Sequence, residues 1–314
     1  MWRKTGGVAR AARLAVLALG WFSGWGLHAA LAADKPVMTW MVPDLPPAFL
    51  LVNGRLTDGS GDLMLKMVIH EWPEVEHRVV ITPISRALAL LEQGDPACFP
   101  AAIINPERER MAYFAPSRIL PPVQVVARAD VVSRLPLNEQ GEVLPVSLFD
   151  RSDLRGLVVL KRSYAPLLDA MLSQRSSTSG LRDTVAADSG SNILQMLNLG
   201  RADYTLEFDW ALAYHRVRHP EFASGVGLKA LPIAGTAPFV GGIACPHTEW
   251  GRMAIRKIDS ILVKVTKMQR YRAAMNRWMT PEAVKRYQAE QAAFYLQRER
   301  PTDPAKFQPW PVAP

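Results

Sequence analysis

Two arginines, Arg108 and Arg110, lie where a predicted strand is followed by a predicted helix. Residues 101–104 have the small and apolar character of a strand end, and residues 105–107, Asn-Pro-Glu, are types that begin a helix. A guanidinium there can hold a carboxylate, because two parallel N–H donors meet two oxygens and arginine stays charged at biological pH. The alternative is that Arg108 is a solvated side chain on a surface helix.

Predicted strands and helices alternate along the chain and would position such groups. Apolar strand-like runs lie at residues 37–42, 77–82, 101–104, 123–127, 156–160, 203–206 and 239–245, with a weaker one at 184–187. Helical patterns lie at residues 62–72, 85–93, 165–173, 192–199, 250–268 and 271–278. This alternation predicts an α/β protein with a mainly parallel sheet in each half.

The order of elements around Arg108 is similar to that of the periplasmic solute-binding proteins of the amino-acid type (family 3, type II fold). The matching features are a strand, a short loop, Glu107-Arg108, the aromatic Phe114 and an extended run that contains prolines. The helix pair after residue 250 resembles the closing segment of that family, so the resemblance covers most of residues 36–280. It implies two lobes, each a mainly parallel sheet flanked by helices, joined by two crossover strands, and it implies that Arg108 holds the ligand carboxylate.

The resemblance also implies other ligand-binding positions. Trp40 and Phe49 are the rings available for an aromatic lid near residues 43–49, and Ser163 matches a hydroxyl at a helix N-terminus. Glu207 and Asp209 lie where the family places an acid for the ligand's amino group. Ser163 is equally consistent with a plain helix cap, and the two acids with solvated rim carboxylates.

Two further positions bear on the ligand. Arg86 is a candidate second pocket guanidinium, or a surface arginine at a helix start. Amino-acid binders usually carry a hydroxyl at the place that Ile103 takes here, with Ala101 and Ala102 beside it. The loss of that donor allows a ligand other than an α-amino acid.

The N-terminus has the pattern of a Sec-type signal peptide over residues 1–33. Basic residues precede an apolar run at 14–27, and Ala30-Leu31-Ala32 has small residues at the cleavage spacing. A retained anchor is the alternative, although the run is short for a bilayer span. The pattern predicts a periplasmic protein.

Charge and cysteine content narrow the function classes. Removing residues 1–33, which hold four basic and no acidic residues, would lower the formal net charge from +8 to +4. Basic residues are spread along the rest of the chain, which argues against nucleic-acid binding. The 6 histidines show no metal-site spacing. Cys98 and Cys245, the 2 cysteines, are a possible disulfide in an oxidising compartment, the alternative being two buried thiols.

These features predict a domain order. A signal peptide (1–33) would be followed by the first part of lobe 1 (34–121), lobe 2 (122–243) and the return segment of lobe 1 (244–280). Residues 281–314 have no counterpart in the family and are expected to form one more helix and a poorly ordered, Pro-rich tail.

The leading hypothesis is a monomeric solute-binding protein that closes two lobes around a small polar, carboxylate-bearing molecule, without a cofactor and without catalysis. It would deliver this ligand to an ABC-transporter permease or to a sensor. Two alternatives stay open. One is a periplasmic enzyme of the dehydratase or lyase type, with Glu207 and Asp209 in acid–base roles. The other is an interaction module with a decayed ligand site, which Ile103 favours.

Overall fold

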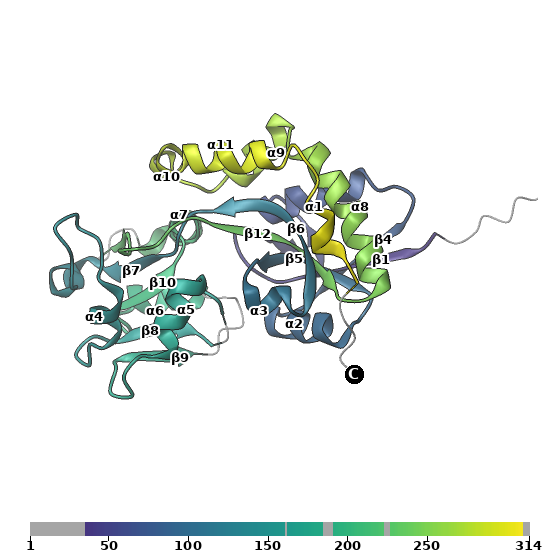
Figure 1. Cartoon of the computed structure of the whole chain (residues 1–314). Helices are drawn as coiled ribbons and strands as arrows, with labels where there is room; N and C mark the ends of the chain where they lie inside the picture. Colours follow the sequence, from purple (N-terminus) through teal and green to yellow (C-terminus); the bar gives the residue numbers. More distant parts are fainter. Residues whose placement is uncertain (1–34, 161, 185–190, 223–226, 310–314) are drawn as a thin grey trace, which may run out of the picture. The chain divides into compact units, whose positions relative to one another are not determined.

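The computed structural model describes residues 35–160, 162–184, 191–222 and 227–309, which belong to one compact unit. The predicted signal peptide lies outside these residues. Within them, no helix combines the length and the apolar character that a membrane span requires. The unit contains two five-stranded sheets, which we use to define lobe 1 and lobe 2 (Figure 1).

The sheet of lobe 1 has the strand order β4-β1-β5-β12-β6. Its strands are β1 (Val37–Val42), β4 (Glu76–Ile81), β5 (Ala97–Ile103), β6 (Ala112–Leu120) and β12 (Phe239–Pro246). The pairs of β1 with β4 and β5 are parallel, whereas β12 is antiparallel to β5 and β6. The main helices of this lobe are α1 (Ser60–His70), α2 (Ile84–Gln93) and α8 (Glu249–Val265). A hairpin of β2 (Leu51–Val52) and β3 (Arg55–Leu56) contacts α1 through β3.

Helix α8 shows why these segments fold as they do. The Thr248 hydroxyl caps it by accepting a hydrogen bond from the Gly251 N–H at 3.0 Å. Its apolar residues recur at helical spacing and are buried in the lobe 1 core, among them Ile255, Ile258 and Leu262. Gly251 is required at the first turn, because a Cβ there would lie 2.0 Å from the Pro246 carbonyl oxygen.

The sheet of lobe 2 has the order β11-β7-β10-β8-β9. Its strands are β7 (Gln124–Arg128), β8 (Gly156–Val159), β9 (Leu181–Thr184), β10 (Tyr204–Glu207) and β11 (Leu228–Leu231). The associated helices are α4 (Pro145–Phe149), α5 (Pro166–Ser173), α6 (Ser191–Asn198) and α7 (Asp209–Arg218), with 3-10 turns η1 (Ala129–Arg134) and η2 (Pro220–Phe222). The pairs β8/β9 and β8/β10 are parallel, and β7 is antiparallel to β10 and β11.

The predicted two-lobe α/β architecture is confirmed, with one correction to the strand directions. In each sheet two of the pairings are parallel and two are antiparallel, so neither sheet is mainly parallel. The antiparallel pairs of lobe 1 arise from β6, a strand that the sequence pattern did not predict, and from β12. These two strands run side by side and lead into and out of lobe 2 (Figure 1). The predicted boundary at residue 244 falls within β12.

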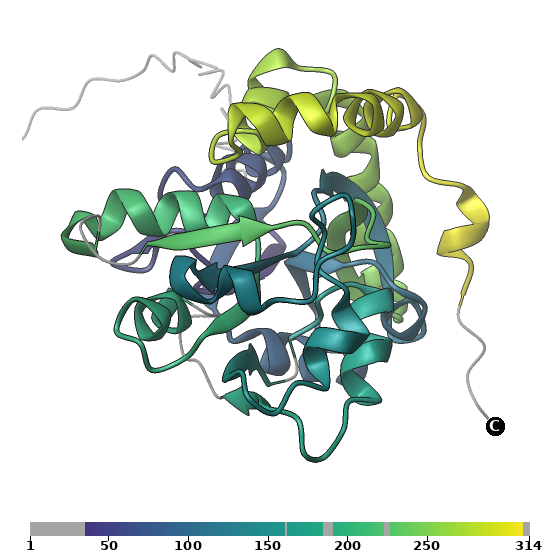
Figure 2. The same cartoon turned by 90° about the vertical axis from the view of Figure 1, so that its left-hand side faces the viewer.

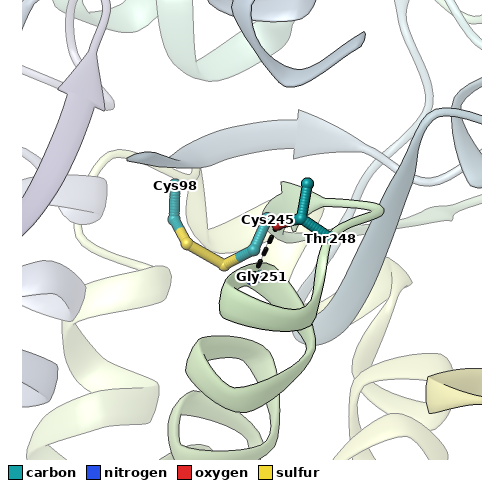
Figure 3. Close-up of a disulfide and its surroundings, with 4 residues drawn as sticks. All are labelled: Cys98, Cys245, Thr248 and Gly251. Atoms are coloured by element: carbon teal, nitrogen blue, oxygen red, sulfur yellow. Dashed lines mark hydrogen bonds between the residues drawn. A yellow bond between two sulfur atoms is a disulfide. The ribbon is translucent and has the colours of Figure 1, made fainter. Parts of the chain in front are cut away.

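The predicted disulfide between Cys98 and Cys245 is confirmed. The two Cα atoms lie 4.4 Å apart on the neighbouring strands β5 and β12, and both side chains are fully buried (Figure 3). The bridge closes a sequence separation of 147 residues that includes all of lobe 2. It therefore ties the return segment of lobe 1 to the part of that lobe that precedes lobe 2.

Residues 269–309, which we call the C-terminal segment, include the helix predicted at 271–278, and beyond residue 280 they are more structured than the expected single helix and tail. The C-terminal segment forms α9 (Gln269–Met275), α10 (Pro281–Arg286), α11 (Gln288–Gln297) and a 3-10 turn, η3 (Pro304–Phe307). The last helices lie along the same side of the two sheets in both views (Figures 1 and 2). Phe294, Tyr295 and Phe307 are buried in the lobe 1 core, and Arg298 pairs with Asp259 at 3.0 Å. These contacts attach the C-terminal segment to lobe 1. Residues 310–314 lie outside the described part.

Candidate functional site

One pocket, with a volume of about 80 Å³, is lined by residues of lobe 1, lobe 2 and the C-terminal segment. Its polar lining residues are three arginines and two serines: Arg108, Arg118, Arg162, Ser60 and Ser163. The remaining lining residues are apolar: Leu45, Ala48, Ile84, Ala101, Ile103, Ile119, Leu120, Pro121, Phe208, Trp210, Met275, Trp278 and Met279. Within the described residues, this lining contains no carboxylate.

Arg108 lies in the short helix α3 (Pro106–Glu109), directly after β5. The Asn105 side chain caps this helix by accepting a hydrogen bond from the Arg108 backbone N–H at 2.8 Å. The guanidinium donates Nη1–H to the Ile103 carbonyl oxygen at 3.3 Å, and the residue is 8% exposed. Burial lowers the pKa of Arg108, while the Asp169 and Glu107 carboxylates act in the opposite direction. The structure thus places Arg108 on the pocket.

Arg118, on β6, is a second pocket arginine that the sequence reasoning missed. It is 7% exposed, and its Nη1–H donates to the Pro100 carbonyl oxygen at 3.2 Å. Its cross-strand neighbour is Gly241, where a Cβ would lie 3.1 Å from the arginine Nε, so the glycine leaves room for this side chain. Burial lowers the pKa of Arg118. The sequence signal was a charged residue inside an otherwise largely apolar strand-like run.

Arg108 and Arg118 are both buried arginines without a carboxylate partner in the described residues. In the described part of the chain, neither guanidinium has a carboxylate within 4 Å, and each has a backbone carbonyl as its hydrogen-bond acceptor. A buried charge is costly unless it is paired and hydrogen-bonded. Both arginines line the same pocket.

Arg162 and Glu207 form a buried ion pair beside the pocket. The guanidinium donates to both carboxylate oxygens, at 2.7 and 2.6 Å, and the two side chains are 9% and 6% exposed. Glu207 also accepts a hydrogen bond from the Phe208 backbone N–H at 2.8 Å. Burial by itself lowers the pKa of Arg162, but the Glu207 carboxylate outweighs it and the pKa is raised. Sequence reasoning found Glu207 but missed its partner, because the two lie on separate elements.

Ser163 lines the pocket, and its hydroxyl is already engaged. It donates to Asp169 Oδ2 at 2.5 Å, and the Tyr164 backbone N–H donates to Asp169 Oδ1 at 2.6 Å. Ala165, which follows, has a φ of 84° that a residue with a side chain rarely adopts. Such backbone strain, of about 1–3 kcal/mol, is common at ligand sites.

The structure places the other predicted positions away from this pocket. Asp209 lies at a separate pocket beside Arg216, Lys229 and Arg286, and its burial raises the pKa of the Asp209 carboxyl. Arg86 is exposed on α2 and does not line the pocket.

The two predicted lid rings are also core residues. Trp40 is fully buried and donates its indole N–H to His77 Nδ1 at 3.0 Å. Phe49 is fully buried against Gly61, where a Cβ would lie 2.5 Å from the ring. Both belong to the buried core of lobe 1, and neither lines the pocket.

The rings that do line the pocket come from lobe 2 and the C-terminal segment. Phe208 and Trp210, directly after β10, stack with ring centroids 4.5 Å apart. Trp278 follows α9 and meets Tyr214 edge-on at 5.0 Å. The Trp278 indole nitrogen is buried and has no hydrogen-bond partner within the described residues. The Trp278 indole N–H is therefore a further hydrogen-bond donor without an acceptor, on a residue that lines the pocket. The sequence signal was the aromatic pair at a strand end.

Comparisons with known proteins place the fold. No protein-family model matches the chain, and no curated protein matches it. Among solved structures, an ancestral arginine-binding protein bound to arginine is similar over 79% of this chain and 99% of its own, with 17% identity and a TM-score of 0.57.

Two further structures have the same architecture. A histidine kinase sensor domain with similarity to periplasmic binding proteins aligns over 78% of this chain and 96% of its own, at 15% identity and a TM-score of 0.58. A structure from work on glutathione import via GshT and the cystine importer TcyBC of Streptococcus mutans aligns over 87% and 99%, at 12% identity and a TM-score of 0.59. This chain has the two-lobe fold of the periplasmic binding proteins.

Proposed function

We propose that this protein is a periplasmic substrate-binding protein that captures a small carboxylate-bearing solute between its two lobes. The observation that carries the proposal is the pair of buried arginines, Arg108 and Arg118, which line one pocket without a carboxylate partner in the described residues. An anion would supply the missing charge and accept charge-assisted hydrogen bonds.

Ligand capture would couple to lobe closure. The pocket lining includes Arg108 from lobe 1 and Trp210 from lobe 2, so a ligand that contacts both favours the conformation in which they are close. The two crossings between the lobes, through residues 121–123 and 232–238, would serve as the hinge. Binding and not catalysis is the function proposed, and the ligand would be passed to an ABC-type permease or reported to a sensor.

The similar structures support this assignment by analogy only. They are named as an arginine-binding protein, a sensor domain and a protein connected with import, which are transport and sensing roles for one fold. An extracytoplasmic location agrees with the disulfide, since such bridges persist in oxidising compartments.

The experiment is a thermal-shift screen of the purified protein against small carboxylates, amino acids and peptides, followed by calorimetry on variants. Arg108→Ala should weaken a carboxylate ligand by about ten- to a hundred-fold, because a hydrogen bond to a charged group contributes about 1.5–3 kcal/mol. Arg108→Lys should rescue only part of the loss, since lysine lacks the planar fork.

The matched control is Arg78→Ala, which removes the same charge from the exposed face of β4. The Arg78 side chain is 61% exposed and its contact to Glu76 is 3.7 Å long, so its loss should leave binding unchanged. If Arg108→Ala binds the carboxylate as tightly as the wild-type protein, the proposed function is wrong at its main residue. Product formation during the screen would instead indicate an enzyme.

A further inference from the structure

The pocket lacks the group that an α-amino acid needs for its ammonium. Within the described residues no carboxylate lines it, and the two serines are the only side-chain hydroxyls. A buried ammonium without a negative or strong acceptor partner is unfavourable, so the lining discriminates against a ligand that carries one.

Two acids that contact pocket-lining side chains are already committed to other groups. Glu207 holds the Arg162 guanidinium through both oxygens, at 2.6 and 2.7 Å. Asp169 has one oxygen on the Ser163 hydroxyl and the other on the Tyr164 N–H. Asp209 lies at the separate pocket. None of these carboxylates can turn toward an ammonium without breaking a short hydrogen bond or moving from its own site.

The donors on the pocket need acceptors instead. Arg108 and Arg118 have no carboxylate partner in the described part, and the buried Trp278 indole N–H has no acceptor there. Of the other polar lining residues, Arg162 is paired with Glu207 and Ser163 with Asp169, which leaves Ser60. The remaining lining is apolar or aromatic, and a second carboxylate on the ligand would have to lie largely against it. The recognition chemistry is therefore one anionic head and one apolar body.

The size of the pocket restricts that body. Its volume of about 80 Å³ compares with an apolar cavity of about 150 Å³ that takes up one benzene molecule. Because the pocket is about half that volume, even a body of one ring requires the lobes to move apart, and a larger body requires a larger movement.

We propose that the ligand is a small monocarboxylate with an apolar alkyl or aryl group and without an ammonium group. This inference rests on the proposed function and specifies its ligand class. Arg108 and Arg118 hold the carboxylate, and Phe208, Trp210 and Trp278 contact the apolar body.

Matched ligand pairs test this directly, because the two members of each pair differ only in the ammonium group. Calorimetry would compare 3-phenylpropionate with phenylalanine, and 4-methylpentanoate with leucine, on the purified protein. We expect the acid without the amino group to bind at least tenfold more tightly in at least one pair. Glutarate should bind more weakly than 4-methylpentanoate.

Three results would overturn the inference in different ways. If neither pair shows a tenfold preference for the acid without the amino group, and Arg108→Ala abolishes binding of the amino acids, the ligand class is wrong while the solute-binding function stands. If no carboxylate of the series binds at millimolar concentration, both the ligand class and the proposed function fail. If glutarate binds more tightly than 4-methylpentanoate, the ligand body is not apolar, and the proposed ligand class is wrong in that respect.

A pair of variants tests whether Arg118 binds the ligand carboxylate. Arg118→Met should weaken 3-phenylpropionate or 4-methylpentanoate at least tenfold, whereas Arg78→Met, on the exposed face of β4, should not change it. Circular dichroism of both variants verifies folding. Unchanged affinity in folded Arg118→Met would remove Arg118 from the anion site.

Discussion

Replacement of Arg118 by methionine should stabilise the ligand-free protein while it impairs binding. Arg118 is 7% exposed, and within the described residues its guanidinium donates to the Pro100 carbonyl oxygen at 3.2 Å. Methionine is unbranched and adaptable enough to fill the space beside Gly241 without a charge. The variant therefore exchanges a buried cation for an apolar side chain in the same position.

The expected size follows from two opposing contributions. Removing a buried ion that lacks an opposite charge relieves a penalty of several kcal/mol, and losing the hydrogen bond to Pro100 costs about 1–2 kcal/mol. The net gain in the free energy of unfolding should be about 1–3 kcal/mol. In a chain of this size each kcal/mol shifts the melting temperature by roughly 2–4 °C.

The assay is thermal and urea unfolding with and without a bound carboxylate, in a buffer free of carboxylate and phosphate anions. Ligand stabilises the folded state by an amount that grows with its concentration relative to Kd, about 2.7 kcal/mol at one hundred times Kd. The wild-type protein should therefore be the less stable form without ligand and should recover most of the difference when ligand is added.

The reasoning fails if ligand-free Arg118→Met is less stable than the wild-type protein despite a native circular dichroism spectrum. That result would mean that the guanidinium is satisfied in the folded state without an anion. Arg78→Met provides the baseline, because an exposed substitution of this kind should change stability by no more than about 0.5 kcal/mol.

Three other predictions concern the disulfide, the pH dependence and export. The double variant Cys98→Ala/Cys245→Ala should lose about 3–5 kcal/mol in urea unfolding, because the bridge closes a separation of 147 residues; equal stability of the two proteins would contradict this. Burial lowers the pKa of His215 from 6.5 to about 4, so the unfolded chain binds more protons between these values and the free energy of unfolding should fall as the pH drops from 6.5 to 4, by up to about 3 kcal/mol. A parallel pH series on His215→Gln should give a shallower slope, and an unchanged slope would exclude His215 as the cause. Intact-mass measurement of exported protein should show a chain that starts at Ala33 or Asp34, whereas a mass that retains residues 14–27 would indicate an anchored form.

Local sequence signals were sufficient for much of the fold. The period of apolar residues in α8 and the run of β1 could be recognised because these patterns depend only on neighbouring positions. The helix start at Asn105-Pro106 likewise placed Arg108 at the end of β5. The number of cysteines and the predicted compartment made their pairing a possibility, and the structure confirms it.

The expected mainly parallel sheets were wrong for half of the pairings, because strand direction is not a local property. The pattern of β6 contains Pro116 and two polar residues, Ser117 and Arg118, which hid a nine-residue strand. Its place in the sheet depends on pairing with β12, which comes more than a hundred positions later in the chain. The C-terminal tail was misjudged for a similar reason, since the burial of Phe307 depends on the lobe 1 core.

The sequence by itself determined most of the elements and the arginine at the end of β5, since each follows from residue types within a few positions, and it made the disulfide one of two possibilities. Only the tertiary structure decided the composition of the pocket. Arg162 and Glu207 are 45 positions apart, and their ion pair forms because β8 and β10 are parallel neighbours. Arg118 meets the pocket through the register of β6 with β12. The electrostatic character of a buried site depends on which charges remain unpaired after such distant contacts form, and local patterns do not encode those contacts.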